Sequence, residues 1–264
     1  MATINKVTVL SIVYNEEQWI WYALQSVLPF VDSIVVVDTG STDKTVDIVQ
    51  SIKSNKIKLE EVGKQDPVQM VSLLNKIAKE IKTEWYIKLD GDEIWSKKSI
   101  EKLIINLSMV DKDIVGIVVK ARLPVGDLFH YQSEEAGKYE LLGMRGHYNI
   151  RAYRKRDGYH WKGTYPLEAY VDSSGNSINE QNSLLFYAKE CEYWHPRHLL
   201  RSSVGTRKIK LEIGKKESVT LPEVFYMDHP PIVPSPWVSF FPIQWIAATV
   251  LTPLLRVKRF LTHS

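Results

Sequence analysis

Apolar residues gather in short runs with little polar alternation through about the first hundred residues of the chain. Such runs are typical of strands that are covered on both faces, as in a parallel sheet. The strands predicted in this way are Val7–Val13, Ser33–Val37, Ile57–Val62 and Glu84–Leu89. Helical spacing of apolar residues predicts helices between them, at Trp19–Val27, Lys44–Ser54 and Val68–Ile81. Strands and helices therefore alternate, which is the pattern of an α/β protein with an open, mostly parallel sheet.

The alternation is lost after residue 99. The elements predicted there are a helix at Ser99–Leu107, a strand at Ile114–Ala121, antiparallel strands at Tyr148–Arg154 and Tyr159–Trp161, a turn at 172–176 and a basic helix at Leu199–Lys215. Residues 126–145 are polar and aromatic without a clear period. The change of pattern divides the chain into residues 1–110, residues 111–228 and a hydrophobic tail at 229–264.

Composition excludes several classes of protein. With 44% hydrophobic and 25% charged residues in 264, the chain is globular and long enough for one large α/β domain or two small ones. Cys191 is the single cysteine, which excludes an intrachain disulfide and a zinc–thiolate cluster. A net charge of +3 is too small to indicate nucleic-acid binding by itself. The first residues do not resemble a secretory signal, so we expect the catalytic part of the chain to face the cytosol.

Polar side chains follow three of the predicted strands, at the point where each strand ends. They are Tyr14-Asn15-Glu16, residues 38–43 (DTGSTD) and residues 90–93 (DGDE). In open α/β sheets the ligand crevice lies outside the carboxyl ends of the strands. We therefore expect these three groups to meet on one rim.

The sequence Asp90-Gly91-Asp92 places two carboxylates in one tight turn. Oxygen ligands of this kind suit a hard divalent cation, which keeps positions open for phosphate oxygens. Such a cation neutralises the negative charge that develops on a departing diphosphate. A surface turn with solvated acids is the alternative interpretation, and the position after a buried strand favours the functional one.

Three motifs resemble the start of a family 2 glycosyltransferase with the GT-A fold. They are SIVYNEE (residues 11–17), VVVDTGSTDKT (residues 35–45) and YIKLDGDE (residues 86–93), in the family's order and with its separations. The resemblance is strongest to the subgroup with lipopolysaccharide-core and peptide glycosyltransferases, and it fades after about residue 120. It implies a Rossmann-like, mostly parallel sheet flanked by helices, with a smaller mixed sheet on the acceptor side. Residues 1–110 would bind the nucleotide sugar, residues 111–228 the acceptor.

The resemblance also implies roles for individual residues. Those placed at the nucleotide are Tyr14, Asn15, Glu16, Asp38, Asn75 and Asp90. Glu16 would lie near the ribose, and Asp38 would accept a hydrogen bond from the base. Asn75 would face the nucleotide or the diphosphate. Asp90 would lie near ribose and metal, and Asp92 would be the main protein ligand of Mg²⁺ or Mn²⁺.

An inverting enzyme also needs a general base for the acceptor hydroxyl. Glu168, in WKGTYPLEAY (residues 161–170), is the candidate. Similar enzymes often carry His-Glu shortly after a glycine in this region, whereas Leu167 stands here in place of the histidine. A solvated strand carboxylate is the alternative for Glu168. Glu93 is a rival base, although a structural role beside the metal is the more usual one at such a position.

Four cationic or imidazole side chains in the second half are candidates for anion or metal contacts. His195 would contact the metal or the diphosphate, because neutral imidazole suits Mn²⁺. Arg151, Arg154 and Arg156 surround one predicted strand and would hold diphosphate or an anionic acceptor. A structural histidine and a solvated basic edge strand are the alternatives, and only one of the three arginines need be functional.

The tail contains an uncharged segment, Trp237–Leu255, that is followed by basic residues. Its length would permit a membrane span, but Pro242 and Pro253 make it a poor one. A helix lying at the membrane surface fits better, with anchors at Trp237, Phe240, Phe241 and Trp245. The alternatives are docking to another subunit and packing on the catalytic domain. Contact with a membrane would favour lipid-linked or envelope glycans as acceptors.

The sequence therefore predicts a metal-dependent inverting glycosyltransferase that uses Mg²⁺ or Mn²⁺ and a nucleotide-diphosphate sugar, with UDP as the expected carrier. The acceptor would be a hydroxyl of a glycan, a lipid-linked glycan or a protein, and homo-oligomers are allowed. The alternatives are a glycosyltransferase for modified DNA bases and a catalytically silent module that binds sugar nucleotides or glycans. A nucleotidyltransferase would need a basic, glycine-rich first loop, and SIVYNEE is acidic instead.

Overall fold

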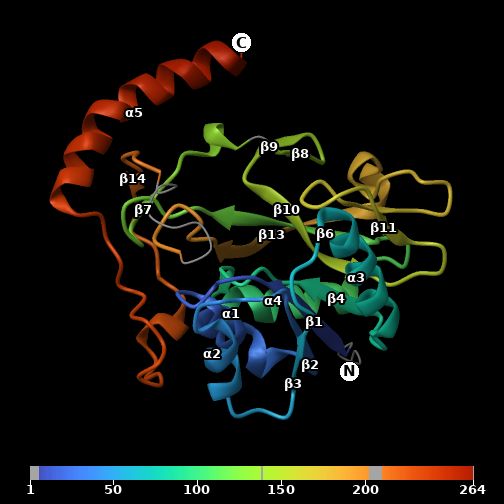
Figure 1. Cartoon of the computed structure of the whole chain (residues 1–264). Coiled ribbons are helices and arrows are strands. Elements are labelled where there is room, and N and C mark those ends of the chain that lie inside the picture. The colour runs from blue at the N-terminus through green and yellow to red at the C-terminus, as the bar shows by residue number, and fades with distance from the viewer. Residues whose placement is uncertain (1–5, 138, 202–209, 264) are drawn as a thin grey trace.

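The computed structural model describes residues 6–137, 139–201 and 210–263. Their main feature is one eight-stranded sheet in the order β3-β2-β1-β4-β10-β6-β13-β5 (Figure 1). The strands of its first half are β1 (Val7–Val13), β2 (Ser33–Asp38), β3 (Ile57–Glu61) and β4 (Trp85–Lys88), all parallel. The α/β architecture expected from the alternating pattern is confirmed.

Strands from the second half of the chain extend the same sheet. They are β10 (Tyr148–Arg154), β6 (Gly116–Arg122), β13 (Leu185–Trp194) and β5 (Ile94–Trp95). The strand β10 runs antiparallel to β4 and to β6, whereas β13 is parallel to β6. Three two-stranded sheets pair β11 (His160–Lys162) with β12 (Ala169–Val171), β14 (Lys215–Lys216) with β7 (His130–Tyr131), and β8 (Tyr139–Leu141) with β9 (Met144–Gly146).

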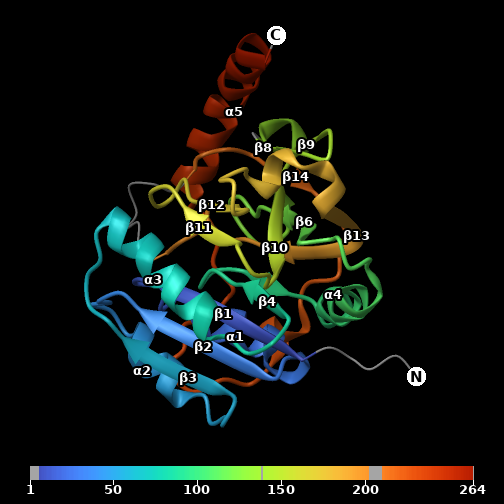
Figure 2. The ribbon, with the colours of Figure 1, turned by 90° about the vertical axis from the view of Figure 1, so that its right-hand side faces the viewer.

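Helices cover both faces of the sheet. They are α1 (Ile20–Val27), α2 (Thr45–Ser51), α3 (Pro67–Glu80), α4 (Lys97–Met109) and α5 (Pro242–His263), with short 3₁₀ turns at Leu28–Phe30, Glu134–Ala136, Ile178–Glu180, Asn182–Leu184 and Glu223–Tyr226. Side chains of β1 alternate between two hydrophobic clusters: Val9 packs with α1, α2 and α4, and Leu10 packs with α3. In Figure 2, α3 and α4 lie on different sides of β4, in agreement with their places in different clusters. Both faces of the sheet are therefore buried, as the apolar runs without polar alternation predict.

Local signals set the helix starts. Asp66 accepts hydrogen bonds from the backbone N–H groups of Val68 and Gln69, and the Gln69 side chain accepts one from the Asp66 N–H, so a capping box starts α3. The Ser96 hydroxyl accepts a bond from the Ser99 N–H at the start of α4. At both ends of Leu199–Lys215 the described residues are not helical, and the remainder of that predicted helix lies outside the described residues.

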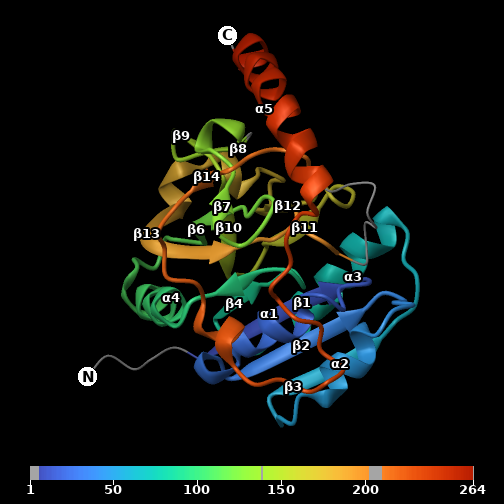
Figure 3. The same ribbon diagram turned by 90° about the vertical axis from the view of Figure 1, so that its left-hand side faces the viewer.

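The hydrophobic tail has two parts with different surroundings. Its first part belongs to a strap, residues 219–241, that begins before the tail and lies against α1 (Figure 3). The Tyr22 hydroxyl donates to the Pro234 carbonyl at 2.8 Å, and the Gln18 amide donates to the Ser235 carbonyl at 2.8 Å. The second part, α5, extends away from the sheet and is 22 residues long. In the described part of the chain, no helix is both long and apolar enough to cross a membrane.

Candidate active site

The loops after β1 and β2 are bound to each other by hydrogen bonds. Asn15 has a positive φ of 52°, a conformation that asparagine tolerates better than most residues. Its backbone N–H donates to the Ser41 hydroxyl at 2.8 Å, and its side-chain oxygen accepts from the Thr42 N–H at 2.7 Å. The Glu16 N–H donates to the Thr45 hydroxyl at 2.8 Å. Two strand ends predicted to lie together therefore form one continuous rim.

Asp38 is buried at the end of β2 and shapes the loop that follows it. Its carboxylate accepts hydrogen bonds from the N–H groups of Gly40 at 2.9 Å and Ser41 at 2.8 Å. Gly40 has a φ of +94°, which favours glycine at this point of the turn. A contact between Asp38 and a nucleotide base stays a prediction. Tyr14, whose side chain is exposed, lies on the same rim.

Arg201 joins Glu16 to Asp92. Its Nη1 lies 2.8 Å from Asp92 Oδ2, and its Nη2 forms an ion pair with Glu16 Oε1. His195 Nε2 lies 3.3 Å from the same Asp92 oxygen. The end of β1, the turn after β4 and the segment after β13 therefore meet at the Asp92 carboxylate.

The turn of Asp90 to Asp92 passes very close to Glu16. A Cβ atom on Gly91 would lie 2.8 Å from Glu16 Cγ, so a side chain at this position would displace one of the two segments. Burial raises the pKa of Asp92, but the positive charge of Arg201 and the contact with His195 lower it more. The net result is a pKa well below the usual range, which keeps this buried group a carboxylate.

Asp90 contacts two buried residues, Arg151 and Glu93. Arg151 Nη2 lies 3.2 Å from Asp90 Oδ2 and also pairs with Glu93, and Arg151 Nε donates to the Tyr193 hydroxyl at 3.2 Å. The Asp90 side chain is 41% exposed, whereas that of Glu93 is 0% exposed. Burial raises the pKa of Glu93 well above its usual value, against the opposing effect of Arg151. Glu93 therefore lies under the rim and not on its surface.

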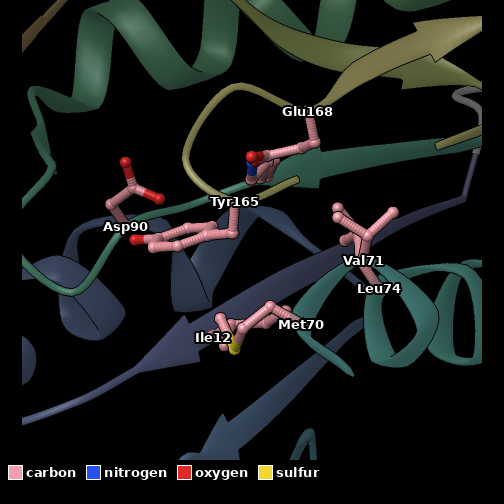
Figure 4. Close-up of a pocket in the computed structure, with 8 residues that line it drawn as sticks. Ile12, Met70, Val71, Leu74, Asp90, Tyr165 and Glu168 are labelled. Carbon is pink, nitrogen blue, oxygen red and sulfur yellow. The ribbon is translucent and has the colours of Figure 1, made fainter. Parts of the chain in front are cut away.

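A pocket opens between Asp90 and the loop that joins β11 to β12 (Figure 4). Its apolar lining comes from Ile12, Met70, Val71 and Leu74, and its polar lining from Lys88, Asp90, Tyr165 and Glu168. The Tyr165 ring reaches towards Asp90. Lys88 Nζ lies 2.5 Å from Glu168 Oε1 and 4.9 Å from the centre of the Trp161 ring. Glu168 Oε2 is buried and has no hydrogen-bond partner among the described residues.

Three residues expected at the nucleotide or diphosphate have other surroundings. The Asn75 amide donates to the Trp161 carbonyl and accepts from the Trp161 N–H, each at 2.8 Å, so it ties α3 to β11. Arg154 pairs with Glu84 at 3.1 Å, donates to the Asp111 and Lys112 carbonyls, and lies opposite Trp85 at the start of β4. The expected diphosphate contact of Arg154 is therefore corrected, because Asp90 follows the other end of β4.

Arg156 lies beyond Arg154, in a second cavity that it lines together with Asn75, Lys79, Lys155, Tyr159 and Tyr170. This cavity is lined by the base of the β11–β12 hairpin, whereas Tyr165 and Glu168 of the hairpin loop line the first pocket. Arg151 is the member of the three arginines that the structure brings to the rim. Arg151 lies within β10 next to Asp90, whereas Arg154, at the end of β10, lies opposite Trp85 at the start of β4, and Arg156 follows β10.

Two residues of the rim, Arg201 and Lys88, were not predicted from the sequence. Arg201 lies in a stretch rich in basic residues, where nothing distinguishes one arginine from its neighbours. Lys88 had a usable signal, because it is a charged residue at the end of a strand that is otherwise apolar and buried, two residues before Asp90. A lysine in such a position needs an anionic partner, and Glu168 provides it.

Comparisons with known proteins give one family and several solved structures that match part of the chain. Residues 8–166 match the model of "Glycosyl transferase family 2". Two crystal structures are similar to part of the chain. One is S. aureus TarS 1–349 in complex with UDP-GlcNAc, with 16% sequence identity, a TM-score of 0.48, and coverage of 73% of this chain and 58% of that chain. The other is glucosyl-3-phosphoglycerate synthase from Mycobacterium tuberculosis with Mn²⁺, UDP and glucosyl-3-phosphoglycerate, with 22% identity, a TM-score of 0.33, and coverage of 46% of this chain and 45% of that chain.

The chain spans less than two thirds of the length of these solved chains. Among curated proteins, none matches it. The family match covers more than half of the chain and includes β1, β2, β4 and the loops that carry Glu16, Asp38 and Asp92. The chain belongs to glycosyl transferase family 2.

Proposed function

We propose that the protein is an inverting glycosyltransferase that moves a sugar from a UDP-linked donor to an acceptor hydroxyl. The observation that carries the proposal is that three separate segments of the chain are joined by ion pairs: Arg201 contacts both Glu16 and Asp92, and His195 contacts Asp92. Positive and negative groups gathered at the carboxyl ends of parallel strands suit a nucleoside diphosphate. Membership of the family supports the same reaction class.

The donor would lie along the rim made by the loops after β1 and β2. Tyr14 offers an exposed aromatic ring to a base, and Asn15 and Glu16 are held in place by bonds to the second loop. Asp90, 41% exposed in its side chain, would accept hydrogen bonds from ribose hydroxyls. These contacts would place the diphosphate near Asp92 and Arg201.

The side chains at Asp92 fit a divalent cation. Asp92 Oδ2 is buried and is contacted by two nitrogen groups, Arg201 Nη1 at 2.8 Å and His195 Nε2 at 3.3 Å. No group of three acidic, histidine or cysteine side chains in the described ranges forms a closed metal site. A cation held by these residues would take several of its ligands from diphosphate and water. Asp92 and His195 would hold Mg²⁺ or Mn²⁺, which would supply positive charge to the departing diphosphate.

Glu168 is the proposed general base, and Glu93 is set aside. The Glu168 carboxylate lines the same pocket as Asp90, and its Oε2 remains available to accept a proton. Lys88 holds the other oxygen and so fixes the direction of the group. The Glu93 side chain, in contrast, is 0% exposed and contacts Arg151, so an acceptor hydroxyl does not reach it. Inversion follows if the acceptor enters from the Glu168 side and the diphosphate leaves towards Asp92.

The test compares the wild-type protein with Asp92→Asn for donor binding, donor hydrolysis and transfer. UDP-sugars with Mn²⁺ should raise the thermal stability of the wild type, because a ligand that binds the folded state stabilises it by mass action. Asp92→Asn should lose the metal-dependent part of that gain and should lower turnover by about 10²-fold or more. Glu101→Gln on the exposed face of α4 is the matched control.

Two outcomes would contradict the proposal. Tight donor binding with no metal-stimulated hydrolysis or transfer to any glycan, lipid-linked or protein acceptor would indicate a silent binding module. Full metal-dependent turnover by Asp92→Asn would remove Asp92 from the cation site.

A further inference from the structure

The helix α5 carries an apolar stripe on the side that is exposed to solvent. The stripe consists of Ile243, Ile246, Val250, Leu254, Val257 and Leu261, which are between 59% and 70% exposed. Their spacing of three or four residues puts them on one side of the helix, since each residue turns by about 100°. Figures 1 to 3 show α5 extending away from the rest of the molecule.

The opposite side of α5 is the one that contacts the protein. Ala248 and Thr252 are buried there, and the Thr252 hydroxyl accepts a hydrogen bond from the Ile213 N–H at 2.7 Å. Arg259 forms a bidentate pair with Glu212 at 2.6 and 2.7 Å. A surface helix of a globular protein normally turns its apolar side inward and its polar side outward. The contact side of α5 is partly apolar, because Ala248 and Trp245 pack with Val125, and the stripe is a second apolar side that the described residues leave exposed. The stripe is therefore available to a partner.

The charges around the stripe indicate the chemistry of that partner. The chain has no acidic residue after Asp228, whereas Arg256 and Lys258 lie on the two flanks of the stripe. In two paired copies of α5 these basic groups would have no acid on the other helix, although acid–base pairs normally set the partner in helix pairing. Headgroups of anionic lipids carry negative charge complementary to these basic residues, and their acyl chains provide the apolar environment.

Aromatic side chains are also exposed near the start of α5. Trp237, Tyr226 and Phe129 are exposed and contact one another, with ring centres 5.2 Å apart for Trp237 and Tyr226 and 6.5 Å apart for Trp237 and Phe129. The same part of the chain meets α5, because Trp245 packs on Gly126. Tryptophan and tyrosine favour the boundary between lipid and water.

We propose that α5 docks in the plane of an anionic membrane surface through the stripe, with Arg256 and Lys258 at the level of the lipid headgroups. No helix of the described residues meets the length and hydropathy of a span, so the proposal concerns the surface of the bilayer and not its interior. The docked protein would act on acceptors at that surface, but the binding itself does not depend on the proposed transfer reaction.

The test is sedimentation of the full chain with vesicles of pure phosphatidylcholine and with vesicles of equal parts phosphatidylcholine and phosphatidylglycerol. The wild type should bind the second kind and lose binding at high salt. Val250→Glu and the double variant Arg256→Gln, Lys258→Gln should each weaken binding by about tenfold or more. Met109→Glu, at an exposed apolar position of α4, should bind as the wild type does. Thermal unfolding and donor hydrolysis in solution should be unchanged in all these variants.

Equal sedimentation of Val250→Glu and wild type would overturn the proposal, and so would the absence of wild-type binding to the anionic vesicles. A lipid-free dimer of the wild type that Val250→Glu converts to a monomer would overturn it as well, because it would make a second copy the partner. Failure of donor turnover with vesicle binding intact would contradict the proposed enzyme function alone.

Discussion

Arg201 and Asp92 form an ion pair with 2.8 Å between Nη1 and Oδ2, and the second amino group of the same guanidinium contacts Glu16. The side chain of Asp92 is 2% exposed, so its charge has little access to water. A buried carboxylate needs such a partner, because an unpaired buried charge is strongly destabilising. The pair therefore connects the stability of the rim with its chemistry.

Arg201→Gln should impair both the fold of the rim and the reaction. We expect transfer to fall by about 10²-fold, since the variant loses positive charge beside the departing diphosphate. The free energy of unfolding should fall by about 3–5 kcal/mol, because the buried Asp92 carboxylate loses its guanidinium partner. Steady-state kinetics and urea unfolding measure the two effects, with Arg145→Gln on the exposed part of β9 as control. Unchanged kinetics would exclude Arg201 from the diphosphate site.

Glu168→Gln should slow transfer by about 10²-fold and leave donor affinity as it is. Glutamine keeps the shape of the side chain and its contact with Lys88 but takes up no proton. Calorimetric titration with UDP gives the affinity, and the transfer rate at saturating donor gives the chemical step. Glu180→Gln, at an exposed position, is the control. Near-normal transfer by the Glu168 variant would remove this residue as the base.

Asn75→Ala should destabilise the protein without a direct effect on donor binding. The variant leaves the buried N–H and carbonyl of Trp161 without partners, which costs about 1–3 kcal/mol. Urea unfolding should report this loss, while the KM for the donor stays close to that of the wild type. Ser72→Ala on the exposed side of α3 is the control. A raised KM at unchanged stability would instead favour the role at the diphosphate that the sequence predicts.

Glu212 should make a pH-dependent contribution to stability. Burial raises its pKa, but bonds from Arg259 and Gln132 lower it more, to about 2 from an ordinary value of 4.5. A carboxyl whose pKa is lower in the folded state stabilises the protein fully above its unfolded pKa and loses that effect as the pH falls to the folded pKa. The difference in stability between wild type and Glu212→Gln should thus be constant above pH ~5 and shrink towards pH ~2. A difference that grows on acidification would contradict this.

The first half of the fold follows from the sequence because its signals are local. Short β-branched runs predict β1 and β2 within a residue of their observed ends, and the groups Asn15-Glu16 and Asp38 follow from where those strands stop. The rim forms because parallel strands bring their carboxyl ends to one edge. Neither inference requires knowledge of distant contacts.

The rest of the site depends on contacts between distant parts of the chain. Arg201 and Glu16 are 185 residues apart, and no local pattern selects this arginine. The roles of Arg154 and Asn75 depend on which edge of the sheet and which strand they meet, and a spacing in the sequence does not contain that information. The extent of α5 also does not follow from a local signal: the helix continues through Pro253 to His263, although proline usually ends a helix.

The strap has a consequence for how the chain can be divided. Its bonds from Tyr22 and Gln18 tie residues 234 and 235 to the helix that follows Glu16, and Val233 and Phe225 complete the apolar cover of that helix. A chain cut before residue 219 would leave the aromatic side chains of α1 open to water, directly behind the first loop of the rim. The tail and the amino-terminal half should accordingly unfold together in a single transition.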